Sequence, residues 1–408
     1  MNITATKNGT CATLLPAGRL DSLTSPQAQA DIDGELARLA PFESLVFDAT
    51  GLEYISSSGL RILLALRKRF PSFRVTGANA DVYQVLDVTG FAKMMPVERA
   101  MRGISVAGCE EIGRGAVGTV YRAGDDTIVK VFREGTDPGE VKREIAMAKE
   151  AFVLGMPTPI SFDAVRVDNR YGLVYELLKA ETLSDRIRRE PGDLDASARL
   201  YAGLFRQLHD IRVEPPTLVP DALEREKAAI RRIERHFGAE AVGLLLGIVS
   251  AIPPGNRLLH GDLQAKNVMM QGGEPMLIDM GEVGCGHPLI DLGHAHSAMA
   301  TFIGDYEPVI GIPRETGAEL WRRTMRHYFD GLSEPEFAHR MEQIATASLV
   351  RNFSWLSLSD SFPEAVVREC REAFDERVTK RRDRIREICA TFADWTLDRD
   401  AAPARPGA

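Results

Sequence analysis

The first hundred residues alternate between short apolar runs and longer stretches in which apolar residues recur every three or four positions. Runs that are rich in β-branched residues and closed by Gly, Pro or Asp predict strands, and the periodic stretches predict amphipathic helices. The predicted strands are 10–18, 44–50 and 73–79, and the predicted helices are 25–40, 59–70 and 80–91. We expect Ser25 to cap the first helix, with Pro26 in its first turn. This alternation predicts a small α/β domain whose sheet is covered by helices.

The pattern changes after about residue 104, where a short connection leads into the glycine-rich stretch EEIGRGAVGTVYRAGDDTIVKVF. Its glycines are Gly113, Gly115 and Gly118, and they are followed by Val120 and Lys130. This glycine spacing occurs in dinucleotide-binding folds, which need a strand, a turn and a helix, and in kinases, which need a hairpin. Two strand patterns surround the glycines here, so we predict a hairpin whose backbone approaches nucleotide phosphates. An ordinary glycine-rich hairpin remains the alternative for this stretch taken alone.

Lys130 lies in the apolar strand pattern IVKVF. A lysine in such a strand either points to solvent or binds the α- and β-phosphates under the glycine-rich turn. The second role needs a carboxylate on the next predicted helix, which offers Glu140 and Glu144. We predict that Glu144 pairs with Lys130, because Glu144 lies in the middle of that helix.

The stretch HGDLQAKN, residues 260–267, is followed by the apolar strand pattern PMLID. Phosphoryl transfer needs magnesium ions on the phosphates and a carboxylate that orients the attacking hydroxyl. Mg²⁺ prefers oxygen ligands and keeps several waters, so one Asn and one Asp suffice. We predict Asp262 as the catalytic base, Asn267 as a metal ligand and Asp279 as the principal metal ligand, with Gly281 allowing the turn that follows. The alternative is a loop with helix caps.

Composition narrows the classes of function. The chain has 408 residues, a formal net charge of −8 and five scattered cysteines, which favour neither a nucleic-acid binder nor a zinc site or disulfide framework. The N-terminus lacks a secretory pattern, and the longest apolar run is too short to span a bilayer. We therefore expect a cytoplasmic protein with no membrane span and no nucleic-acid partner. The end of the chain, residues 396–408, is predicted to be disordered.

Residues 1–100 resemble a STAS domain, the fold of bacterial anti-sigma-factor antagonists. The resemblance rests on GRLDSLTSPQ, LVFDATGLEYISSSGLRILL and VLDVTGF. It implies that Ser57 is a phosphoacceptor at the start of a helix and that the domain binds a protein partner. The acidic residue that precedes the phosphoacceptor in that family is Ser56 here. The alternative is that Ser56 or Ser57 only caps the helix.

The remainder resembles the protein-kinase-like fold, and more closely the branch of aminoglycoside phosphotransferases and choline kinases, which carries HGDxxxxN. The resemblance implies ATP and Mg²⁺ as cofactors and a two-lobed domain over 104–395, with an N-lobe at 104–178 and a C-lobe at 179–395. It places IDMG where kinases have DFG, and it places the adenine-binding hinge at Glu176, Leu177 and Leu178. It also gives Asp291 a structural role at a helix start, and His260 a role in supporting the loop.

The predicted fold class is thus α/β and α+β, a small STAS α/β domain followed by a bilobal protein-kinase-like domain. The predicted function is ATP-dependent transfer of a phosphate to a hydroxyl of an unidentified acceptor, regulated by the STAS domain. Only nine residues separate Gly281 from Asp291, which leaves no room for a long activation segment and favours a small-molecule acceptor. Two alternatives are a non-catalytic scaffold that senses nucleotide and a kinase that acts on a STAS serine.

Overall fold

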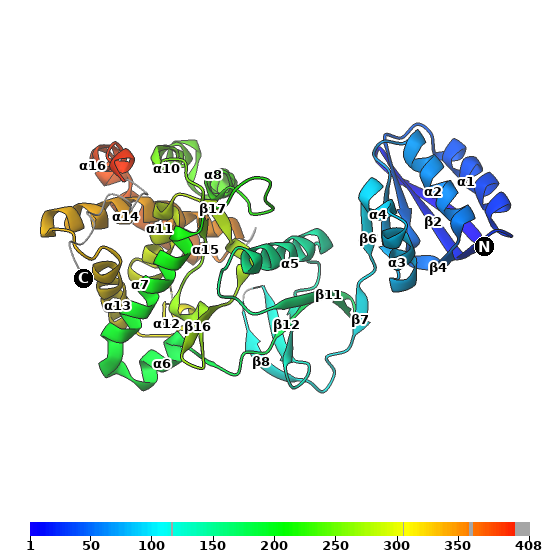
Figure 1. The fold of residues 1–408 in the computed structure, drawn as a ribbon. Coiled ribbons are helices and arrows are strands. Elements are labelled where there is room, and N and C mark those ends of the chain that lie inside the picture. The colour runs from blue at the N-terminus through cyan, green and yellow to red at the C-terminus, as the bar shows by residue number, and fades with distance from the viewer. Residues whose placement is uncertain (116, 305, 359–361, 396–408) are drawn as a thin grey trace, which may run out of the picture. The chain divides into compact units, whose positions relative to one another are not determined.

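The computed structural model describes residues 1–115, 117–304, 306–358 and 362–395. The predicted disordered tail, 396–408, lies outside the described residues. Contacts divide the chain into two compact units. The first unit comprises Met1–Ser105 together with Val165–Asn169, and the second comprises Val106–Ala164 and Arg170–Ala408. Figure 1 shows both units as ribbons.

The first unit is a mixed sheet with helices between its strands. Its elements are β1 (Asn2–Asn8), β2 (Cys11–Leu20), α1 (Ser25–Leu39), β3 (Ser44–Asp48), β4 (Leu52–Ile55), α2 (Ser57–Arg69), β5 (Arg74–Ala78), α3 (Ala80–Val88), α4 (Phe91–Met94), β6 (Val97–Arg99) and β7 (Arg102–Ile104). The strands follow the order β1-β2-β3-β5-β6, and β4 pairs with β2. Strands β1 and β2 are antiparallel, whereas the other pairs of this sheet are parallel. The alternation of strands and helices along the chain explains the parallel pairs, because parallel neighbours need a crossover.

One hydrophobic core holds the first unit together. Ile32 and Leu36 of α1 share it with Leu63 of α2 and Phe47 of β3. Gly59 allows this packing, because a Cβ at that position would lie 2.7 Å from Cγ1 of Ile55 and 2.9 Å from the backbone oxygen of Leu20. The glycine of the SSSG stretch is therefore required where α2 passes close to β2 and β4.

Two local predictions for this region were wrong. The N-cap of α1 is Thr24, and Ser25 is the first helical residue, whose hydroxyl donates to the backbone oxygen of Asp21 at 2.5 Å. The predicted short connection before residue 104 contains strands β6 and β7. These strands form because β6 pairs with β5, and β7 pairs with residues of β11 far along the chain.

The N-terminal lobe of the second unit is built on an antiparallel sheet. Its elements are β8 (Glu110–Arg114), β9 (Gly118–Arg122), β10 (Thr127–Phe132), α5 (Pro138–Val153), β11 (Ser161–Val167) and β12 (Arg170–Glu176). The strand order is β11-β12-β10-β9-β8, with β7 beside β11. The hairpin predicted for the glycine-rich stretch is β8 and β9, followed by β10. Asp137 caps α5 by accepting from the backbone N–H of Gly139.

The C-terminal lobe is mostly helical. Its helices are α6 (Leu183–Arg189), α7 (Leu194–Asp210), α8 (Ala222–Arg232), α9 (Glu234–Phe237), α10 (Ala239–Ala251), α11 (Pro288–Ala300), α12 (Tyr306–Ile310), α13 (Arg314–Tyr328), α14 (Glu334–Ser354), α15 (Glu364–Arg377) and α16 (Arg382–Cys389). Its short strands are β13 (Glu181–Thr182), β14 (Arg257–Leu259), β15 (Val268–Gln271), β16 (Glu274–Leu277) and β17 (Gly284–Gly286). They form a three-stranded sheet, β13-β15-β16, and a pair, β14-β17.

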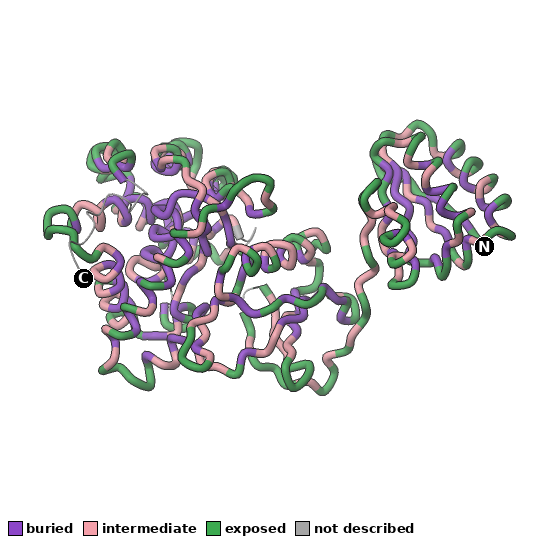
Figure 2. Tube along the Cα trace, in the orientation of Figure 1, coloured by how far each residue is buried: buried purple, intermediate pink, exposed green. Residues whose placement is uncertain are grey.

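Helix α11 lies in the centre of this lobe. Figure 2 shows that this helix is buried, and eleven of its residues are buried. It contacts α14 and α13, and α13 in turn contacts α7. The lobe therefore surrounds α11 with helices, and this buried helix carries polar side chains toward the loop that follows β14. The mixed α/β fold class with a small sheet domain followed by a two-lobed domain is confirmed. Within the described ranges, none of the helices has the length and apolar character needed to cross a membrane.

Candidate active site

The loop after β14 holds Asp262 in one orientation. The side-chain amide of Asn267 donates to both Oδ2 and the backbone oxygen of Asp262, each at 2.9 Å. Gln264 donates to the same Oδ2 at 3.1 Å. These bonds leave the other carboxylate oxygen, Oδ1, without a hydrogen bond from the described residues. An acceptor oxygen fixed in this way suits a general base, whose free oxygen must reach the proton that it accepts.

Gly261 makes the sharp turn into this loop. Its φ is +80°, and a Cβ there would overlap the backbone oxygen of Glu282. Both the left-handed backbone and the close approach therefore require glycine. The glycine of HGD thus has a structural cause in this chain.

Asp291 fixes the backbone of the loop by accepting two hydrogen bonds from it. It is fully buried in α11 and accepts from the backbone N–H of Gly261 at 2.7 Å and of His260 at 3.2 Å. Burial acts to raise the pKa of Asp291, but His209, whose Nε2 lies 3.3 Å away, outweighs it and the pKa is lowered. His287 caps α11, and Asp291 in the first turn of that helix holds the loop.

His260 supports the loop, as the resemblance to phosphotransferases implied. Its ring is fully buried, with Nε2 3.1 Å from the backbone oxygen of Ile278. The backbone N–H of Asp262 donates to Nδ1 at 3.3 Å. These two contacts assign the hydrogen to Nε2, because a carbonyl oxygen can only accept and Nδ1 must accept from the N–H. The ring therefore joins the loop of Asp262 to the segment that leads into Asp279.

Asp279 lies two residues beyond the end of β16. Its φ is +67°, so the chain already turns at Asp279, and the turn predicted at Gly281 follows as the 3₁₀ helix Met280–Glu282. The backbone N–H of the preceding residue, Ile278, donates to the oxygen of Asn267 at 3.0 Å, which brings the two predicted metal ligands onto adjacent segments. The Asp279 carboxylate is 45% exposed and lies 3.2 Å from Nζ of Lys130. An αL conformation at a non-glycine residue is strained and is found mainly where surrounding structure imposes it.

Lys130 is held between two carboxylates. Its ammonium lies 2.8 Å from Glu144 of α5 and 3.2 Å from Asp279. Burial acts to lower the pKa of Lys130, but Asp279 and Glu144 outweigh it and the pKa is raised. Glu144 is buried whereas Glu140 is exposed in the first turn of α5, so the structure brings Glu144 to Lys130. Lys130 consequently links both lobes of the second unit.

The glycine-rich turn connects β8 to β9 beside Lys130. Gly113 and Val120 pair across the hairpin, and Val120 pairs with Lys130. Gly118 must be glycine, because a Cβ there would overlap the backbone oxygen of Val131. A Cβ added at Gly115 would meet no atom within 4 Å, so the turn is open at this position. The glycines therefore have two different causes, close packing at one position and an open approach at another.

The predicted hinge follows β12. The Glu176 carboxylate accepts from the backbone N–H of Ile160 at 3.3 Å, and the N–H of Leu177 donates to the backbone of Asp126 at 2.9 Å. The N–H of Leu178 makes no hydrogen bond to another described residue, and its side chain is buried. Of these three residues, Leu178 is thus the one whose backbone donor is free for an adenine.

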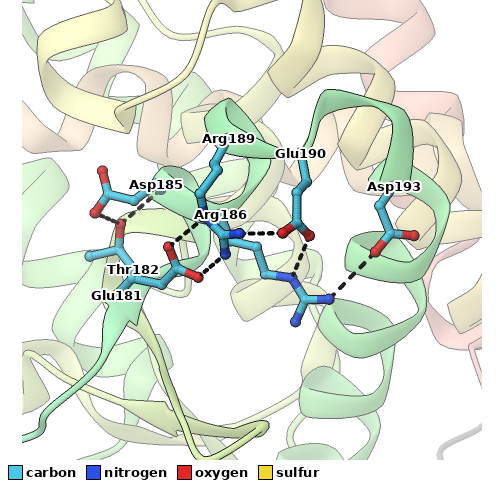
Figure 3. Close-up of polar contacts among 7 residues, drawn as sticks. All are labelled: Glu181, Thr182, Asp185, Arg186, Arg189, Glu190 and Asp193. Atoms are coloured by element: carbon cyan, nitrogen blue, oxygen red, sulfur yellow. Dashed lines mark hydrogen bonds and ion pairs between the residues drawn. The ribbon is translucent and has the colours of Figure 1, made fainter.

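Surface charges fix the segment that comes directly after the hinge. Figure 3 shows Thr182 at the start of α6, with Arg189 paired to Glu181 and Arg186 paired to Asp193 at 3.4 Å. Exposed ion pairs contribute at most about 1 kcal/mol each. Their role here is to hold α6 in register with β13 rather than to supply much stability.

The electrostatic surroundings of Asp262 include residues that sequence reasoning missed. Burial raises the pKa of Asp262, Arg351 of α14 opposes this, and Asp279 adds to it, so that the pKa is raised overall. Burial acts to lower the pKa of Arg351, but the charges of Glu282 and Glu226 outweigh it and the pKa is raised. No local motif marks Arg351, because its charge acts on Asp262 only through the packing of α14 against α11 and α8.

The residues present fit a nucleotide with magnesium. The amide nitrogen of Asn267 is bound to Asp262, which turns its oxygen away from that carboxylate, and Asp279 offers a half-exposed oxygen pair. Among the described residues, no group of three or more His, Cys, Asp or Glu is arranged to hold a metal ion. A site with one Asn and one Asp agrees with this, since Mg²⁺ at nucleotide sites takes its other ligands from phosphates and water.

Two family models match the chain. A model described as "Phosphotransferase enzyme family" matches residues 108–327, and a STAS domain model matches residues 2–102. The chain belongs to the phosphotransferase enzyme family and carries a STAS domain at its N-terminus. The second unit therefore has the fold of a kinase-like phosphotransferase, a family whose chemistry is ATP-dependent phosphoryl transfer. A comparison with curated proteins found no match.

Solved structures resemble each part. An ADP-bound aminoglycoside phosphotransferase is 18% identical, with a TM-score of 0.45 over 66% of this chain and 92% of its own. A choline/ethanolamine kinase family protein from Mesorhizobium loti is 18% identical, with a TM-score of 0.45 over 69% of this chain and 92% of its own. An anti-sigma factor antagonist from Mycobacterium paratuberculosis is 23% identical, with a TM-score of 0.22 over 24% of this chain and 84% of its own.

Proposed function

We propose that the protein transfers the γ-phosphate of ATP to a hydroxyl group of a small molecule. Asp262 orients that hydroxyl and accepts its proton, and Asn267 and Asp279 hold magnesium. When bound, Mg²⁺ neutralises phosphate charge. Lys130 binds the nucleotide phosphates, Glu144 keeps Lys130 in place, and the backbone of Leu178 contacts the adenine. The glycine-rich turn from Gly113 to Gly118, with Val120, covers the phosphates.

The observation that carries this proposal is the state of the Asp262 carboxylate. Oδ2 accepts hydrogen bonds from Asn267 and Gln264, and Oδ1 accepts none from the residues that the structure describes. A loop that served only to cap helices would not need Asp291 and His260 to fix its backbone and Asn267 to bind one carboxylate oxygen of Asp262. Two of these side chains belong to the loop itself, and Asp291 comes from α11.

A small-molecule acceptor is favoured by the short path from Asp279 to α11. The 3₁₀ helix Met280–Glu282 and strand β17 fill this path, and α11 begins at Pro288. No segment is left there that could dock an extended peptide. The charges of Arg351, Asp279 and Glu282 act on Asp262, so a polar acceptor suits the site.

The test is an acceptor screen with the full chain. ADP formation from Mg·ATP is measured with a panel of polyols, amino alcohols, sugars and nucleosides, and phosphorylated products are identified by mass spectrometry. The proposal expects acceptor-dependent ADP release and a product that is heavier by one phosphate. ATP binding without acceptor-dependent turnover over a broad panel would support the nucleotide-sensing scaffold instead.

We further propose that the STAS domain regulates transfer through Ser57. Ser57 is exposed as the first residue of α2, and Ser56, not Ser57, caps that helix by accepting from the N–H of Ser58 at 3.2 Å. The Ser57 hydroxyl is therefore free for modification, and a helix N-terminus favours a phosphate. Rates of Ser57→Asp and Ser57→Ala full-length variants would differ if this holds, and equal rates would contradict it.

A further inference from the structure

The N-lobe sheet of the second unit has two faces of opposite character. Cross-strand partners share a face, and successive residues of a strand alternate between faces. The pairs Gly113–Val120, Val120–Lys130 and Lys130–Leu173 therefore form one row on the nucleotide face. The neighbouring pairs Arg114–Thr119, Thr119–Val131 and Val131–Gly172 form a second row on the opposite face.

The second row creates a hollow. Thr119, Val131 and Gly172 are small or medium-sized, whereas Arg114 stands at one end of the row. Arg170 lies two residues before Gly172 on the same strand, so it occupies the same face. A cavity of about 380 Å³ lies here, and its lining includes Arg114, Thr119, Val131, Arg133, Glu134 and Arg170. Thr119 and Val131 thus line the cavity together with the arginines, and Gly115, Gly118 and Phe132 complete its lining.

The charges around this hollow are mostly unpaired. Arg114 is bound by Glu111 at 2.8 Å. In the part of the chain that the structure describes, the guanidinium groups of Arg133 and Arg170 have no hydrogen-bond or ion-pair partner, and neither has the Thr119 hydroxyl. Glu134 is the one carboxylate among the lining residues that the structure describes. On the other face, Lys130 differs from Arg133 and Arg170, because Lys130 has two carboxylate partners.

The geometry suits an anion between the arginines. Strands β8 and β12 are separated by three strand spacings, about 14 Å, so long side chains from both ends can approach one ligand above Thr119. Guanidinium groups match phosphate oxygens in pairs, which a lysine cannot do. Arg133 and Arg170 have no carboxylate partner among the described residues, so a bound dianion would neutralise charge that is otherwise unpaired.

We propose that Arg114, Arg133 and Arg170 form a second anion site, which binds the phosphate group of a small molecule on the sheet face opposite Lys130. This site lies on the sheet face opposite Lys130, Val120 and Gly113, and it borders the glycine-rich turn at Gly115 and Gly118. It does not depend on the phosphotransferase reaction and would exist in a catalytically inactive chain.

Titration calorimetry of the full chain with inorganic phosphate, at constant ionic strength, tests the proposal. We expect saturable binding to one site, and we expect it to persist when a non-hydrolysable ATP analogue with Mg²⁺ saturates the nucleotide site. The double variant Arg133→Ala/Arg170→Ala should bind phosphate at least about tenfold more weakly, because two bidentate partners are lost.

The matched control is Arg166→Ala, which removes an exposed arginine of β11 that does not line the cavity. Its phosphate affinity should equal that of the wild type. Thermal unfolding and affinity for the ATP analogue verify that each variant is folded. Displacement of phosphate by the ATP analogue, wild-type affinity in the double variant, equal losses in the control, or no saturable binding would each overturn the proposal.

Discussion

Two polar turns of this chain, the Ser56–Gly59 turn of the first unit and the Gly261–Asn267 loop of the second, both follow short strands and both need a glycine for close packing. They differ in what surrounds them. The first has one side-chain bond, from the N–H of Ser58 to Ser56, and leaves Ser57 exposed. The second is fixed by side chains from α11 and by its own residues. The difference separates a turn open to modification from a loop whose charges are held before any ligand binds.

Asp279→Ala should have the largest effect on this contrast. Removing the proposed metal ligand should lower ADP formation by about 10³-fold, since a metal at the phosphates provides several kcal/mol of stabilisation. Steady-state kinetics at saturating Mg²⁺ measure this. The matched control is Asp163→Ala, which changes an exposed aspartate of β11 in the other lobe and should keep near-wild-type rates. Equal rates in Asp279→Ala and the control would remove Asp279 from the site.

Asp291→Asn tests whether the second loop is held by a buried charge. The change weakens the bonds to the N–H groups of His260 and Gly261 and leaves His209 without its carboxylate partner. Loss of such a buried partner costs about 3–5 kcal/mol. Denaturant unfolding at neutral pH should show this loss in the free energy of unfolding.

The pH dependence of that loss sharpens the same test. The pKa of Asp291 is lowered in the folded protein from its ordinary value of 3.8, so its stabilising effect is complete above that value. As pH falls below 3.8, the unfolded chain takes up the proton first, and the difference in unfolding free energy between wild type and Asp291→Asn should shrink. A difference that grows toward low pH would contradict the assigned interaction.

Glu144→Gln should have a moderate effect, because Lys130 keeps Asp279 as a partner. The remaining amide supports Lys130 less well, so we expect kcat/KM for ATP to fall by about tenfold, mainly through a higher KM. Glu140→Gln changes an exposed carboxylate of the same helix and should leave both constants unchanged. A larger effect from Glu140→Gln would mean that the partner of Lys130 is misassigned.

The first turn should respond least. Ser56→Ala removes the helix cap and should lower the unfolding free energy of the first unit by about 1 kcal/mol. Ser57→Ala removes an exposed hydroxyl that the cap does not use, and should cost at most a few tenths of a kcal/mol. Thermal unfolding of the two full-length variants compares them directly. If Ser57→Ala costs more than Ser56→Ala, Ser57 has a structural role that its exposure does not show.

Sequence reasoning reached the parts of the site that lie within short motifs. Gly118, Lys130 and Asp262 lie in motifs whose order along the chain is typical of kinase-like proteins. Glu144 was predicted as the partner of Lys130 from its position in the next helix. Arg351 and the loop-holding role of Asp291 were missed. They act through the packing of α14 and α11 around the loop, and helical periodicity says only that these residues face inward.

The fold shows the same limit. Strands β2, β3 and β5 of the first unit were predicted, β1 and β4 were not, and the residues of β6 and β7 were assigned to a connection. Their three-residue lengths carry no pattern, and they are strands only because β5 and β11 offer free edges far away in sequence. The cap at Thr24 was missed for a different reason, since Ser25 is an equally good capping residue one position later.

The most direct test of the central claim is Asp262→Asn in the full chain, with two quantities measured together. Loss of the proton acceptor should lower acceptor-dependent ADP formation by about 10²–10⁴-fold. The affinity for Mg²⁺ with a non-hydrolysable ATP analogue should stay within about twofold of the wild type, because Lys130, Asn267 and Asp279 are unchanged. Retention of turnover, or loss of nucleotide binding in a folded variant, would contradict the assignment of Asp262 as the catalytic base.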